Sequence, residues 1–268
     1  MSGVGGVGGG TAVDGAEHPR VDVLGTRISA VDPARAVAEV ARWIHEHERS
    51  YVCVTGVHGV MESVRDPELR AIHNASGLTV PDGMPMVWAA HRAGVPAARR
   101  VYGPDLMLAV LARAAEEGWS SYYYGGAPGV PEELARRMEE RFPGAKTAGA
   151  YSPPYRPLTA VETYEVRERI NLSGADLVWV GLSTPKQERW MAEHRAALAA
   201  PVLLGVGAAF DFHTGRVSQA PEVLQRNGLE WAYRLHREPR RLWRRYLRNN
   251  PEYLARLAVR PPRLVREP

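Results

Sequence analysis

Short apolar runs alternate with longer amphipathic segments along most of the chain. The segments between the runs carry apolar residues at a spacing near 3.6, which is typical of helices. Strands that alternate with helices indicate right-handed βαβ units. The sequence therefore predicts an α/β fold, with a Rossmann-like, mainly parallel sheet covered by helices on both faces. The predicted strands of this sheet are 51–55, 78–80, 120–125, 146–151, 176–181 and 201–207.

The two ends of the chain depart from this pattern. Residues 1–20 are Gly-rich, and we expect a disordered leader there. Residues 21–29 predict a β-ribbon that begins an α/β domain of residues 21–228, whose first helix starts at Asp32-Pro33. Residues 229–268 are helical in pattern, basic and rich in Trp and Tyr, with no apolar strand after them. We interpret them as a C-terminal helical appendage.

The composition limits the classes of protein. Apolar residues make up 45% of the 268 positions, enough for a sizeable core. The single cysteine, Cys53, excludes an intrachain disulfide and a Cys-based zinc cluster, and it is expected to be a core residue. The longest apolar stretch, 201–210, is about half of what a membrane-spanning helix needs. We expect a soluble or peripheral protein.

Positive charge is concentrated in the appendage. The net charge is +4, but the residues from Arg234 onward carry +8 and the rest of the chain −4. Basic segments of this kind bind anionic membranes or nucleic acid, and aromatic residues such as Trp231 and Trp243 suit both. The charge pattern alone leaves both partners open. The candidate contact residues are Arg234, Arg237, Arg241, Arg244 and Arg245.

Polar or Gly-rich signatures follow five of the predicted strands. Ligands bind beyond the carboxyl ends of the strands in open parallel sheets, so these positions are candidates for a site. Asp82, in VPDGMP, is either the polar residue of a tight turn or a carboxylate held at a strand end for chemistry. The other candidates at strand ends are Thr55, His58, Gly125, Gly126, Lys186, Gln187, Glu188 and Asp211.

Several candidates have a plain structural alternative. Gly125 and Gly126 permit a phosphate to approach a helix N-terminus, or form an ordinary strand-to-helix turn. Lys186, one of two lysines beside 32 arginines, is a point charge near a diphosphate or a solvated helix start. Arg100 reaches the cleft as a clamp or lies at the surface. His58 has no second ligand at metal spacing, and the chain has no Asp-x-Asp motif, so no metal is expected.

Five blocks, taken together, resemble the WecG/TagA/CpsF glycosyltransferases: VPDGMPMVW, RRVYGPDL, YYYGGAPGV, VGLSTPKQERW and GVGAAFDFHTG. The resemblance implies transfer of a sugar from a UDP-sugar to a polyprenyl-diphosphate-linked acceptor at the cytoplasmic membrane face. It implies inversion without a metal or other cofactor. It makes Asp82 the general base, implicates Arg100 in catalysis and places Gln187 in the donor pocket.

One block departs from the family pattern. Many members have T-x-N at the first strand end, whereas this chain has Val57 at the Asn position and His58 after it. We expect His58 to replace the missing polar contact. The expected partners are a UDP-sugar, a lipid-linked glycan and an anionic membrane, without nucleic acid, and a homo-oligomer stays open. A non-catalytic nucleotide- or nucleic-acid-binding module with a basic arm is the alternative, and a UDP-sugar hydrolase is a third reading.

Overall fold

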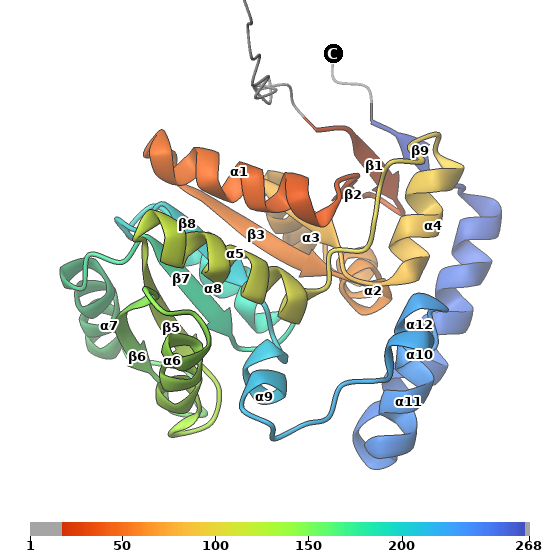
Figure 1. Cartoon of the computed structure of the whole chain (residues 1–268). Coiled ribbons are helices and arrows are strands. Elements are labelled where there is room, and N and C mark those ends of the chain that lie inside the picture. The colour runs from red at the N-terminus through yellow and green to blue at the C-terminus, as the bar shows by residue number, and fades with distance from the viewer. Residues whose placement is uncertain (1–17, 266–268) are drawn as a thin grey trace, which may run out of the picture.

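The computed structural model describes residues 18–265, apart from the side chain of Arg241, and its centre is a six-stranded parallel sheet (Figure 1). The α/β prediction and all six predicted strands are confirmed. Cys53 is buried in this sheet, as expected. In spatial order the strands are β4 (Leu78–Pro81), β3 (Ser50–Thr55), β8 (Val202–Gly205), β7 (Leu177–Gly181), β5 (Ser120–Gly125) and β6 (Lys146–Tyr151).

Helices cover both faces of the sheet, as predicted. Two separate clusters of buried side chains fill the space between the sheet and its helices, one on each face. One face carries α1 (Pro33–His45), α5 (Gly103–Glu117), α6 (Val130–Arg141) and the short α9 (Ala209–His213). The other carries α3 (Pro67–Ala75), α7 (Ala160–Leu172) and α8 (Lys186–His194).

The predicted cap of the first helix is confirmed. The Asp32 side chain accepts a hydrogen bond from the backbone N–H of Arg35 at 2.7 Å, and Pro33 occupies the first helical turn. This bond satisfies one of the N–H groups that a helix start leaves without a partner.

A small antiparallel sheet joins the two ends of the described chain. The predicted ribbon forms β1 (Arg20–Val23) and β2 (Thr26–Ser29), and β1 also pairs with β9 (Arg263–Leu264). The sequence did not predict β9, because two exposed residues carry no apolar alternation. A third core cluster lies between this sheet, α2 (Val57–Arg65), α4 (Met84–Arg92) and the last long helix. The appendage is therefore joined to the start of the α/β domain.

After α9 a long loop leads to α10 (Glu222–Arg226), which precedes the predicted appendage of residues 229–268 (Figure 1). The appendage itself forms α11 (Glu230–Arg237) and α12 (Pro239–Val259) and ends in β9. Most of the predicted leader lies outside the described residues, but Arg20 at its end belongs to β1. Within residues 18–265, no helix is both long and apolar enough to cross a membrane.

The order of the strands creates a crevice at their carboxyl ends. β3 and β8 are neighbours, but the chain leaves β3 toward the face of α3 and leaves β8 toward the face of α9. Connections that diverge in this way leave an open space beyond the strand ends, where ligands bind in folds of this type.

Candidate active site

A cavity of about 760 Å³ lies between the carboxyl ends of β3 and β4 and the appendage. This volume falls in the range of small-molecule sites. Of the ten predicted catalytic and substrate-binding residues, three line it: His58, Asp82 and Arg100. The structure thus places the predicted general base at a cavity large enough for a nucleotide sugar.

Asp82 is held firmly at the end of β4. Its backbone N–H donates to the carbonyl of Thr55 at 3.1 Å, and its Oδ1 accepts from the backbone N–H of Gly103 at 3.2 Å. Its Oδ2 lies near Gly56, where an added Cβ would sit 3.8 Å away. Among the described residues Oδ2 has no hydrogen-bond donor, so this oxygen has an open acceptor position.

Arg100 connects the Asp82 turn to the appendage. Its Nε donates to the backbone carbonyl of Asp82 at 2.7 Å, and its Nη1 donates to Oε1 of Gln225 at 2.8 Å. Its Nη2 forms an ion pair with Glu230. The guanidinium also lies 4.0 Å from the centre of the Tyr102 ring. Arg100 therefore uses its donors on the protein itself and fixes the geometry of Asp82.

Glu230 brings a second carboxyl group to the same end of the cavity. Burial raises the pKa of Glu230, and the negative charge of Asp82 raises it further, while Arg100 and Arg234 act against this shift. Burial also raises the pKa of Tyr102, helped by the carboxylates of Glu230 and Asp82. The two carboxyl groups thus interact electrostatically across Arg100.

His58 contacts the appendage. Its Nδ1 lies 3.1 Å from Nδ2 of Asn249 in α12, whose Oδ1 accepts from Nη1 of Arg65 at 2.9 Å. Because the amide oxygen of Asn249 faces Arg65, its NH₂ group faces the ring, and Nδ1 of His58 is the acceptor. Burial, with the charges of Arg245 and Arg65, lowers the pKa of His58 to about 3. His58 is therefore a neutral ring that joins α2 to α12.

Gln187 and Glu188 lie beneath the strand ends rather than on the cavity wall. Nε2 of Gln187 donates to the carbonyl of Gly205 at 3.1 Å and to Oε1 of Glu188 at 3.2 Å. The same carboxyl oxygen accepts from the hydroxyl of Thr184 at 2.8 Å, and Thr184 does line the cavity. Burial raises the pKa of Glu188. These two side chains support the loop that carries Thr184.

The Gly125–Gly126 turn is explained by backbone packing. A Cβ on Gly125 would lie 2.7 Å from the backbone of Gly181, and its φ is 118°. The N–H of Gly126 donates to the carbonyl of Gly181 at 3.0 Å, so this donor is used within the protein. The side chain of Lys186 is exposed, with Nζ 4.6 Å from the centre of the Tyr155 ring.

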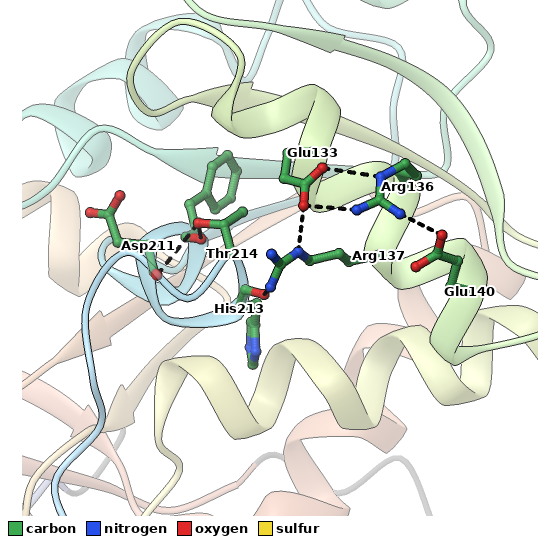
Figure 2. Close-up of polar contacts among 8 residues, drawn as sticks. Glu133, Arg136, Arg137, Glu140, Asp211, His213 and Thr214 are labelled. Atoms are coloured by element: carbon green, nitrogen blue, oxygen red, sulfur yellow. Dashed lines mark hydrogen bonds and ion pairs between the residues drawn. The ribbon is translucent and has the colours of Figure 1, made fainter.

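Asp211 belongs to α9, on the side of the crevice near α6. Its carboxylate points away from the ion pair between Glu133 and Arg137 of α6 (Figure 2). Arg137 also donates to the backbone carbonyl of His213 at 3.1 Å, which fixes α9 against α6. Asp211, Lys186, Gly125 and Gly126 do not line the cavity. A role for them in donor binding stays a prediction.

Thr55 is buried at the end of β3, and its hydroxyl has no hydrogen-bond partner among the described residues.

The predicted basic contact residues of the appendage divide into two groups. Arg234 and Arg245 line the cavity, whereas Arg237 and Arg244 are exposed outside it. The side chain of the fifth predicted contact, Arg241, lies outside the described residues.

Sequence reasoning missed several residues of this cavity. Gln225, Glu230 and Asn249 hold Arg100 and His58. Gln225 lies just before the predicted appendage, and Glu230 and Asn249 lie within it, where the sequence pointed only to basic and aromatic residues. The one signal available in the sequence was Glu230, an acidic residue at the start of an otherwise basic helical segment. Across residues 18–265, no cluster of three or more His, Cys, Asp or Glu side chains could hold a metal ion. Metal independence stays a prediction.

Comparison with known proteins places this geometry in context. Residues 21–266 match the model of the "Glycosyl transferase WecG/TagA/CpsF family". A relative from Bacillus spizizenii, the "N-acetylglucosaminyldiphosphoundecaprenol N-acetyl-beta-D-mannosaminyltransferase", is 31% identical over 212 residues, which cover 79% of this chain and 80% of the relative.

Proposed function

The chain belongs to the WecG/TagA/CpsF family of glycosyltransferases, and we propose that it moves an N-acetylmannosamine-type sugar or related hexose from a UDP-sugar to a polyprenyl-diphosphate-linked acceptor. The name of the Bacillus spizizenii relative supports both the type of sugar and the lipid-linked acceptor. The transfer inverts the anomeric centre, needs no metal, and serves the synthesis of a cell-surface polysaccharide or teichoic-acid-like polymer.

The observation that carries the mechanism is the open Oδ2 of Asp82 beside the cavity. The acceptor hydroxyl attacks the anomeric carbon as Oδ2 takes the hydroxyl proton, and the bond to the UDP oxygen breaks with its electron pair leaving on UDP. A base within hydrogen-bond reach of the attacking hydroxyl accelerates such a step. Attack from the face opposite UDP produces inversion.

The departing diphosphate needs positive charge. Arg234 and Arg245 line the cavity, and Nε of Arg234 has no hydrogen-bond partner among the described residues. Arg100 acts differently in this proposal, because it holds the backbone of Asp82. Fixed positive groups at the point where charge develops stabilise the transition state.

The proposal places the protein on the inner face of the cell membrane as a peripheral enzyme. Arg237 and Arg244 project from the appendage, and Trp243 beside them is 45% exposed. Exposed arginines attract anionic lipids, and Trp favours the membrane–water interface. This placement brings the cavity close to a lipid-linked acceptor.

The test is UDP release from UDP-N-acetylmannosamine in the presence of a synthetic lipid-diphosphate-N-acetylglucosamine. We expect Asp82→Asn to lower kcat by at least about a hundredfold while UDP binding, measured by calorimetry, is retained. Full activity of Asp82→Asn would refute the assignment of the base. The matched control is Asp105→Asn, because it removes an exposed carboxylate nearby in α5 by the same substitution.

The same measurements decide between this proposal and its alternatives. A rate of UDP release that is equally fast without acceptor would indicate a UDP-sugar hydrolase. Salt-sensitive binding to single-stranded nucleic acid without affinity for UDP would indicate the binding module. Family membership favours the transferase.

A further inference from the structure

The cavity has two chemically different ends. Its charged end holds Asp82, Arg100 and Glu230, together with Arg234 and Arg245. Its other part, which we call the apolar lobe, lies between α4 and the last turns of α12, from Tyr253 onward, and among the described residues Arg92 is its one charged lining residue. The apolar lobe is lined by Met84, Trp88, Leu254, Leu257, Ala258 and Pro262.

The apolar lobe exposes large side chains that the core does not use. Trp88 is 52% exposed and Leu254 is 66% exposed, although both line the same cavity. The indole ring of Trp88 packs closely on Gly228, where an added Cβ would lie 3.0 Å from the ring. Exposed apolar side chains gathered at a concave surface are typical of a binding site.

We propose that the apolar lobe binds the first segment of the acceptor's lipid chain, where that chain joins the diphosphate. The inference rests on the proposed function, and it assigns a separate subsite within it. A UDP-sugar is polar throughout and has no part that suits the lobe. A lipid diphosphate joins an anionic head directly to an apolar chain, and the cavity joins an end with three arginines and two carboxyl groups to an apolar part.

Burial of the chain should give a large and measurable gain. Each methylene removed from water improves affinity about fourfold at most. The lobe is also open at the exposed side chains of Trp88 and Leu254, so a longer chain can continue outward. Affinity should therefore rise with chain length at first and then reach a plateau.

The experiment uses the full-length protein without membranes. Acceptors with the same sugar-diphosphate head and chains of one to four isoprene units are compared below their micelle concentrations. We expect the acceptor KM to fall by at least about tenfold as the chain lengthens. Leu254→Ser should remove this dependence by raising the KM of the longer acceptors toward that of the one-unit acceptor.

The chain offers matched controls on the same helix. Leu247 is 66% exposed, as Leu254 is, but it does not line the cavity, so Leu247→Ser should keep the wild-type dependence on chain length. A second pair introduces charge: Ala258→Asp in the lobe should raise the KM of long-chain acceptors, and the exposed Ala255→Asp outside it should not. Equal effects of the two variants in either pair would overturn the inference.

A binding titration keeps this inference separate from the proposed function. The Kd of lipid diphosphates without a sugar is measured for the same chain lengths and variants. A Kd that depends on chain length and loses this dependence in Leu254→Ser supports the lobe, even if no sugar is transferred. Transfer with a KM and a Kd that ignore chain length refutes the lobe and leaves the glycosyltransferase proposal standing.

Discussion

Arg100 and Glu230 form an ion pair that joins the α/β domain to the appendage at the candidate base. The same guanidinium donates to the backbone carbonyl of Asp82, so a single side chain bridges the catalytic turn and α11. Both partners are largely shielded, with exposed side-chain fractions of 15% for Arg100 and 18% for Glu230. Docking of α11 and placement of Asp82 are therefore linked through Arg100.

Arg100→Lys should separate charge from geometry. Lysine keeps the positive charge but cannot reach Asp82, Gln225 and Glu230 at once, because it lacks the planar fork of donors. We expect kcat to fall about 10- to 100-fold with little change in UDP affinity, since small displacements of catalytic groups have effects of this size. Arg99→Lys, at the exposed neighbouring position, is the control for kinetics. A wild-type kcat for Arg100→Lys would show that charge alone suffices.

Because of His58, folding stability should decrease in acid. Its pKa is about 3 in the folded protein and about 6.5 when unfolded, so only the unfolded state gains this proton between those values. Stability is therefore lost as the pH falls from about 6.5 toward 3, by up to about 1.4 kcal/mol for each pH unit. In urea unfolding, His58→Gln should lose about 1–2 kcal/mol less than wild type between pH 7 and pH 5. Parallel losses in both proteins would contradict this role.

Glu188 should give folding stability the opposite dependence on pH, with stability lost as the pH rises. Its pKa is raised, so the folded protein retains a proton that the unfolded chain releases above about 4.5, and stability falls as the pH rises through that range. Glu188→Gln cannot ionise and still accepts from Thr184 and Gln187. It should gain stability relative to wild type between pH 4.5 and pH 7, measured by urea unfolding. Glu188→Ala should instead cost about 2–4 kcal/mol at either pH, because it leaves a cavity and unpaired donors.

The exposed arginines of the appendage should control membrane binding. Each is worth about 1 kcal/mol near an anionic surface, so reversal of both charges in Arg237→Glu/Arg244→Glu should weaken binding to anionic vesicles by at least about tenfold. The measurement is sedimentation of the protein with vesicles that contain either roughly 30 mol % anionic lipid or none, at low and at high salt. Arg113→Glu, exposed on α5, is the control. Binding that does not respond to the double variant would exclude this surface.

The fold could be predicted because its signals are local. Each of the six parallel strands is an apolar run, and Asp32-Pro33 marks a helix start through a hydrogen bond within one turn. β9 escaped prediction because it exists only through its pairing with β1, more than 200 residues away in sequence. Isolated pairs of exposed residues carry no pattern that could reveal such a partner.

The candidate site was predictable only in part for the same reason. Asp82 was a candidate because it follows a predicted strand, the family resemblance implicated Arg100, and the structure brings both to one cavity. The positions of Gln187 and Glu188 beneath the strands depend on which way their side chains turn at the start of α8, which spacing does not specify. The partners of His58 and Arg100 come from α10, α11 and α12, so only tertiary structure could supply them.

The pairing of β9 with β1 means that the C-terminal helices are not a loose arm. Glu230 fastens their beginning to Arg100, and Arg263–Leu264 fasten their end to the N-terminal ribbon. Helices that are fixed at both ends cannot rotate away from the α/β domain as a hinged lid would. A lipid-linked acceptor would therefore enter the cavity without displacing these helices, through the side of the apolar lobe that Trp88 and Leu254 leave exposed.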